Sequence, residues 1–115
     1  AAAIGLDGVI VSNHGGRQCD GTPAALHRLP EIKQAVGDDM KVLFDSGVRT
    51  GLDVIRALAL GADFVLLGRP FMYGVAALGE AGGMHAVEIL RDDLKNNMIQ
   101  LGCRNLGELS SRLTQ

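Results

Sequence analysis

The sequence has little of what would mark several other classes of protein. It contains no tryptophan, only 3% of its residues are aromatic, and its 11 basic residues are balanced by 13 acidic ones, for a formal net charge of −2. Because the charges nearly cancel and form no basic stripe, the sequence does not indicate a nucleic-acid-binding protein. Its most apolar stretches are short, and the one at 64–68 is closed by Asp63 and Arg69, which excludes a membrane span.

Cysteine is scarce as well. The two cysteines, Cys19 and Cys103, do not have the spacing of a metal site, so no bound metal is predicted. The first residues carry no basic leader of a secretory signal. We therefore expect free thiols, a cytoplasmic location, and a small, semi-buried side chain at each cysteine.

What is present suits one folded unit. The 115 residues are 47% hydrophobic and 21% charged, which is the balance of a single domain and not of a disordered chain. The 16 glycines recur at the ends of apolar runs. At such places glycine lets the chain turn or approach a ligand closely.

Apolar patterning predicts three repeats of strand and helix. Three apolar, β-branched runs predict strands over 8–12, 41–45 and 64–68. Thr22 and Pro23 predict the start of the helix after the first strand, and Pro30 predicts its division into two short helices. Thr50 and Asp53 have the spacing of a capping box, which predicts the start of the next helix.

The C-terminal part predicts further helices. A short helix is expected around 71–78, and Gly82 and Gly83 are expected to break the chain after it. Apolar residues at helical spacing then predict a longer helix that Gly102 ends, with one face formed by Val87, Leu90, Leu94, Met98 and Leu101. Asn105 is expected to cap a last short helix.

This order predicts an α/β fold with a parallel sheet. The strands are apolar throughout, which is typical of a parallel sheet covered on both faces. Three βα units are too few for a closed barrel, which needs eight such units and roughly 200 residues or more. The chain is therefore either a small doubly wound sheet or the end of a barrel whose other strands lie elsewhere.

The loops after the second and third strands predict a phosphate site. In parallel folds, ligands bind at the carboxyl ends of the strands. Gly47 and Gly68 expose backbone N–H groups there, and Arg49 and Arg69 can each grip a phosphate with two hydrogen bonds. The start of a helix near Thr50 would add a favourable dipole. The alternative is that both arginines are merely solvated.

The loop after the first strand predicts acid–base chemistry. A neutral imidazole such as that of His14 can accept a proton near physiological pH. Arg17, three residues later, can bind a carboxylate. The alternative is a structural histidine bonded to backbone, which is the expected role of His27 and His85 within helices.

The runs that contain these residues resemble a known family. Ser-Asn-His-Gly-Gly-Arg-Gln at 12–18, Asp-Ser-Gly-Val-Arg-Thr-Gly-Leu-Asp-Val at 45–54, and Gly-Arg-Pro at 68–70 resemble the FMN-dependent α-hydroxy-acid oxidases and dehydrogenases. That family includes glycolate oxidase, L-lactate dehydrogenase and mandelate dehydrogenase. The run at 12–18 is the most specific of them. The resemblance implies that residues 1–115 form a single partial domain, the C-terminal three βα units of a TIM (β/α)8 barrel.

The resemblance implies a role for each loop. His14 would be the base that takes a proton from an L-2-hydroxy acid such as lactate, and it would also contact this substrate. Arg17 would bind the substrate carboxylate, and Ser12 would lie under the flavin. FMN, as the cofactor, would be held by the remaining residues of this set, namely Asp45, Ser46, Gly47, Val48, Arg49, Gly68 and Arg69.

The sequence also departs from the family. Many members have Asp-Gly-Gly where this chain has Asp45, Ser46 and Gly47, a difference expected to be neutral. Three features of the family have no counterpart here: its lysine near the flavin, its aspartate partner for the base, and its tyrosines near the substrate. The one tyrosine of this chain, Tyr73, follows the last strand and is therefore in a different place. The resemblance therefore implies half an active site.

Two other functions stay open at this point. The chain could be an inactive FMN- or phosphate-binding module, or half of a split barrel that needs a complementing chain. It could also be a phosphosugar or nucleotide barrel without flavin, which would leave His14 and Arg17 without a role. The resemblance further implies a homo-oligomer, and leaves open a peripheral association of the parent protein with the inner membrane.

Overall fold

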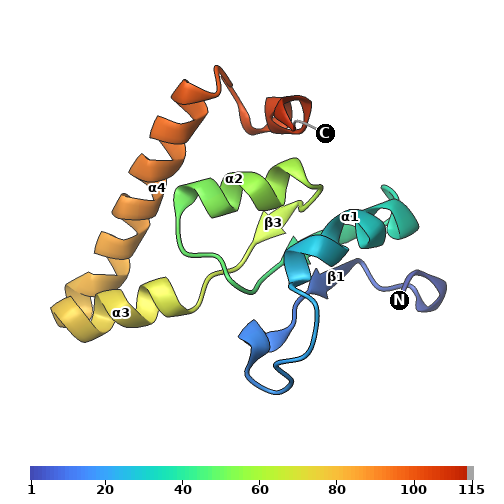
Figure 1. Cartoon of the computed structure of the whole chain (residues 1–115), viewed down its shortest axis with the longest axis horizontal. Helices are drawn as coiled ribbons and strands as arrows, with labels where there is room; N and C mark the ends of the chain where they lie inside the picture. Colours follow the sequence, from blue (N-terminus) through green and yellow to red (C-terminus); the bar gives the residue numbers. More distant parts are fainter. Residues whose placement is uncertain (114–115) are drawn as a thin grey trace.

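The chain folds around one small parallel sheet (Figure 1). The computed structural model describes residues 1–113. The strands are β1 (Gly8–Val11), β2 (Lys41–Phe44) and β3 (Phe64–Val65), which lie in the order β1-β2-β3. The α-helices are α1 (Ala25–Val36), α2 (Gly51–Ala59), α3 (Arg69–Leu78) and α4 (Gly82–Gln100). The 3-10 helices are η1 (Ala2–Ile4), η2 (His14–Gly16), η3 (Gly79–Ala81) and η4 (Leu106–Arg112).

The sheet brings the ends of its strands into line. Both pairings are parallel, with Val11 opposite Phe44 and Phe44 opposite Val65. The three predicted strands are confirmed, although each ends one to three residues earlier than the apolar run. Because the strands end in register, the loops that follow them emerge along one edge.

The core lies between the sheet and helices α1 and α2. Val42 and Phe44 of β2 and Leu29 of α1 are almost completely buried. Within residues 1–113, the opposite face of the sheet is much less covered. Two of its side chains are largely exposed, Ile10 at 52% and Phe64 at 60%. The prediction that both faces are covered is therefore wrong for residues 1–113, because all the covering helices come from one side.

Helix α1 is continuous, and the predicted break at Pro30 is wrong. The helix runs from Ala25 to Val36 with Pro30 inside it. A proline there removes one backbone hydrogen bond, but the apolar face around the buried Leu29 packs on the sheet and holds the helix together. The predicted start is also wrong, since the Thr22 hydroxyl donates instead to the carbonyl of Cys19 at 2.9 Å.

Helix α2 is sandwiched between the sheet and the C-terminal helices. Its Ile55 and Ala59 form a second core cluster with Cys103 and Leu109, against which α4 also packs. Figure 1 shows α4 and η4 lying beyond α2, away from β1. Cys103 is buried as expected, whereas Cys19 is exposed because it lies in the loop between β1 and α1.

The break between α3 and α4 falls earlier than predicted. Gly79, at a φ of 58°, ends α3, whereas Gly82 and Gly83 begin α4. A side chain at Gly82 would collide with the backbone of Gly74. This pair of glycines therefore lets the two helices cross at close range. In the part of the chain that the structure describes, no helix is both long and apolar enough to cross a membrane.

Candidate active site at the carboxyl edge of the sheet

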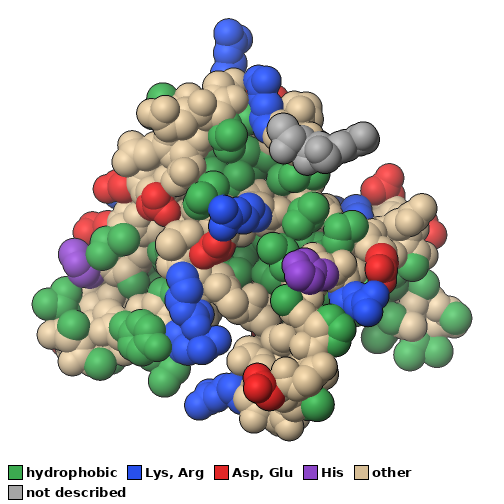
Figure 2. All heavy atoms as spheres, viewed as in Figure 1, with side chains coloured by type: hydrophobic (Ala, Val, Ile, Leu, Met, Phe, Trp, Pro, Cys, Tyr) green, Lys and Arg blue, Asp and Glu red, His purple; other side chains and the backbone are tan. Residues whose placement is uncertain are grey.

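The loops after the three strands line one open cavity of about 800 Å³. Figure 2 shows Lys and Arg side chains gathered around the hollow between α3 and the segment that follows β1. Every residue predicted for the site contributes to the cavity wall: Ser12, His14, Arg17, Asp45, Ser46, Gly47, Val48, Arg49, Gly68 and Arg69. Residues from three separate stretches of sequence are thus brought together.

Further residues of the wall were not predicted. They are Ile10, Gly15, Gln18, Leu66, Leu67 and Met72. Ile10 comes from the uncovered face of the sheet and Met72 from the first turns of α3, so the cavity has an apolar side as well as a charged one. The signal for Ile10 was its place in an apolar strand, which by itself does not reveal which face it occupies.

His14 lies in an unusual backbone conformation. Its φ is 56°, and the next residue, Gly15, has a φ of 67°. A positive φ is uncommon for a residue with a side chain and has a cost that its surroundings must offset. Here the backbone N–H of His14 donates to Ser12 Oγ at 3.1 Å, and His14 is an exposed residue of the cavity wall.

Asp45 and Ser46 connect the first loop to the second. The carboxylate oxygen Oδ1 of Asp45 accepts hydrogen bonds from Ser12 Oγ at 2.5 Å and from Ser46 Oγ at 2.7 Å. Ser46 Oγ in turn accepts from the backbone N–H of Asn13 at 3.1 Å and of Gly15 at 3.2 Å. Ser46, which was expected to be a neutral replacement, therefore has four hydrogen-bond partners in the site, the fourth being Ser12 Oγ at 3.4 Å.

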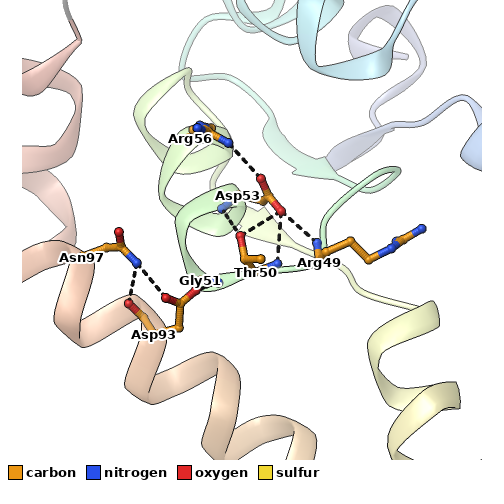
Figure 3. Close-up of polar contacts among 7 residues, drawn as sticks. All are labelled: Arg49, Thr50, Gly51, Asp53, Arg56, Asp93 and Asn97. Atoms are coloured by element: carbon orange, nitrogen blue, oxygen red, sulfur yellow. Dashed lines mark hydrogen bonds and ion pairs between the residues drawn. The ribbon is translucent and has the colours of Figure 1, made fainter.

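The three arginines have different contacts. Arg69 reaches across to the first loop, where its guanidinium would lie 3.0 Å from a β-carbon placed on Gly15. Arg49 donates to the carbonyl of Val48 at 3.2 Å. Figure 3 shows its side chain extending away from α2, while the Val48 side chain is buried in the core. Arg17 is exposed at the cavity wall.

The N-terminus of α2 is already occupied by carboxylates. The predicted capping box is present, and Asp53 Oδ2 accepts from the backbone N–H groups of Arg49 and Thr50 at 3.1 Å each (Figure 3). Burial raises the pKa of Asp53, but hydrogen bonds from Thr50, the Arg49 backbone and Arg56 outweigh this, so the pKa lies below its ordinary value. The expectation that this helix end attracts phosphate is therefore not supported.

A second carboxylate at the same helix end comes from α4. Asp93 Oδ2 accepts from the backbone N–H of Gly51 at 2.6 Å, and Asn97 Nδ2 donates to Asp93 Oδ1 at 2.9 Å (Figure 3). The backbone of Leu94 lies so near Gly51 that a β-carbon there would collide with it. These contacts fix α2, and with it the loop that carries Arg49, against α4.

The N-terminus of α3 has different surroundings. It has Pro70 in its first turn, no side chain among the described residues caps it, and its first turn holds no acidic residue. Gly68 at its start and Gly47 in the neighbouring loop both face open space where a side chain would be. An uncapped helix start with two arginines beside it is a suitable place for an anion.

Comparison with known proteins places these residues in context. A family model described as FMN-dependent dehydrogenase matches residues 1–115. The chain is 49% identical over 111 residues to an L-lactate dehydrogenase of Pseudomonas paraeruginosa, a match that covers 96% of this chain and 29% of the relative. It is 50% identical over 110 residues to an L-lactate dehydrogenase of Azorhizobium caulinodans, with the same coverage.

The structural comparison agrees. A crystal structure of mandelate oxidase with benzoyl-formic acid superposes with a TM-score of 0.90 at 43% identity and covers 95% of this chain and 32% of that one. The present chain thus spans about a third or less of the length of the relatives to which it is similar.

Proposed function

Because this chain belongs to the FMN-dependent dehydrogenase family, we propose that it supplies the base and the FMN-phosphate site of a barrel enzyme that oxidises a small L-2-hydroxy acid. Family membership confirms the resemblance seen in the sequence and the prediction of FMN as the cofactor. The observation that supports the proposal best is the single cavity lined by all the predicted site residues. The L-lactate dehydrogenase relatives favour a lactate-like acid.

The residues of the cavity fit an FMN phosphate. The uncapped start of α3, the open space at Gly47 and Gly68, and the guanidiniums of Arg49 and Arg69 together offer N–H donors and positive charge. A phosphate dianion is best held by such donors, and barrels often bind phosphate after their last strands. In this proposal the phosphate lies at α3, since N–H groups at the start of α2 already have carboxylate partners: those of Arg49 and Thr50 donate to Asp53, and that of Gly51 donates to Asp93.

The first loop would act on the substrate. FMN, when bound, supplies the electron acceptor of the oxidation. Arg17 would pair with the substrate carboxylate and so orient the acid in the cavity. His14 would then take a proton, either from the α-carbon or from the hydroxyl group, since both are within the chemistry of a neutral imidazole. Asp45 accepts hydrogen bonds from Ser12 in the first loop and from Ser46 in the second, and would so hold the two loops in position relative to each other.

The remaining strands of the barrel would complete the site. Relatives are about three times as long as this chain, and the uncovered face of the sheet presents Ile10 and Phe64 to solvent. We propose that this face forms part of the interior of a (β/α)8 barrel, with further βα units along both edges of the sheet. An open parallel sheet otherwise leaves unpaired backbone groups at β1 and β3.

A chimera tests the function. The chain would replace the segment that it matches in the Pseudomonas paraeruginosa relative, and purified protein would be assayed for FMN absorbance and L-lactate turnover. His14→Gln should lower kcat by a factor of about 100 or more, the usual contribution of a general base, with FMN still bound. His27→Gln, in α1 and away from the cavity, should leave turnover unchanged.

Two results would contradict the proposal. Turnover retained in His14→Gln would show that His14 is not the base. A folded chimera without FMN would show that these residues do not form the phosphate site, and would favour the interpretation that this chain is an inactive module.

A further inference from the structure

Ser46 joins the two halves of the site through a single hydroxyl group. Its one proton is donated to Asp45 Oδ1 at 2.7 Å, and its oxygen accepts from the backbone N–H groups of Asn13 and Gly15 at 3.1 and 3.2 Å. Those two residues flank His14 in the chain. The hydroxyl thus holds the backbone on both sides of the proposed base.

The backbone around this contact needs such support. His14 and Gly15 both have positive φ, at 56° and 67°, and so does Ser46 itself, at 91°. A serine gains nothing from that conformation, which glycine adopts freely. The hydrogen bonds of the Ser46 hydroxyl offset the cost of this strained backbone conformation.

The neighbouring contacts point the same way. Ser12 Oγ accepts from the backbone N–H of His14 and donates to the same oxygen of Asp45. Loop residues 12–15 are therefore bound to Asp45 and Ser46 by several hydrogen bonds, and His14 itself lines the cavity. Among the side chains of residues 1–113, that of Ser46 alone is hydrogen-bonded to the backbone on both sides of His14.

We propose that Ser46 is a positioning residue, which sets the position of His14 from the loop that also carries Gly47 and Arg49. This inference rests on the proposed function. Because the same loop would hold the FMN phosphate, the placement of the base and the binding of the cofactor are linked through one side chain. A glycine at position 46 would relieve the backbone but would release Asn13 and Gly15.

The first test measures the contact itself. Backbone amide exchange is measured by NMR in the chain, in Ser46→Gly and in Ser46→Ala. Exchange at Asn13 and Gly15 should rise about fivefold to tenfold, as expected for the loss of a hydrogen bond, while exchange at Val42 in β2 stays the same. Ser46→Gly guards against misfolding, since glycine accepts the φ of 91°.

The second test measures catalysis in the chimera. Both variants should lower kcat about tenfold, with KM and FMN content little changed, because the base is displaced while the phosphate donors remain. Ser110→Ala and Ser110→Gly, at an exposed position in η4, are the matched controls and should leave kcat unchanged.

The outcomes separate this proposal from the function it rests on. Unchanged exchange at Asn13 and Gly15 in both variants overturns the role of Ser46, and so does raised exchange with unchanged kcat. Raised exchange in the chain variants, together with a chimera that has no turnover even with Ser46, supports the contact and overturns the proposed function.

Discussion

Asp93 in α4 accepts a 2.6 Å hydrogen bond from the backbone N–H of Gly51 in the first turn of α2. These residues are 42 positions apart in the sequence. Asn97 holds the Asp93 carboxylate in place by a second hydrogen bond. A helix outside the cavity therefore fixes the start of α2, and so the loop just before it, in which Arg49 lies.

Gly51→Ala should destabilise the fold. Its β-carbon would collide with the backbone of Leu94, so α2 and α4 would have to move apart. Such overpacking costs about 1–3 kcal/mol in the free energy of unfolding, measured by urea denaturation. Gly21→Ala is the control, because nothing lies near a β-carbon there. Equal stability of the two variants would show that α4 is not held as closely as the structure has it.

Asp53→Asn should weaken α2 in a pH-dependent way. Removing the charge from the capping box should cost about 1 kcal/mol at neutral pH, as for other helix caps. The pKa of Asp53 is lower in the folded protein than in the unfolded one, so its contribution is present above about pH 4 and is lost as the pH falls through the folded value.

The difference between the parent and Asp53→Asn should therefore shrink in acid. Denaturation at neutral pH and at a pH below the folded pKa measures it, with Asp39→Asn, at an exposed position, as the control. A difference that stays constant with pH would mean that the charge of Asp53 does not matter.

Arg69→Ala should weaken the binding of FMN but not of riboflavin. Removing a charge-assisted hydrogen bond to phosphate should raise the Kd for FMN roughly tenfold to hundredfold. Riboflavin lacks the phosphate, so its Kd should not change. Flavin fluorescence titration of the apo-chimera measures both, and Arg104→Ala, outside the cavity wall, is the control. An equal loss for both flavins would place Arg69 away from the phosphate.

Ile10→Glu with Phe64→Glu should make the chain by itself less prone to associate. Both side chains are more than half exposed on the uncovered face of the sheet, where apolar surface favours self-association. Light scattering should show smaller particles for the double variant. Ile4→Glu, 77% exposed in η1, is the control that adds charge elsewhere. An unchanged particle size would mean that this face does not drive association.

Local sequence patterns predicted most elements correctly. The strands, the capping box of Thr50 and Asp53, and the helices α3 and α4 follow from apolar spacing and from residues that interact with near neighbours. The predictions for Pro30 and Thr22 were wrong, because there the packing of α1 on the sheet decided the outcome.

The sequence by itself determined which residues are candidates for the site, since His14, Arg17, Asp45, Arg49 and Arg69 all follow strands. Only the tertiary structure decided how they are connected. Asp53 and Asp93 occupy the N-terminus of α2, and the hydroxyl of Ser46 spans two loops. Such contacts join residues far apart in the chain, and a hydrogen bond depends on positions in space that the spacing of residues along a sequence does not specify.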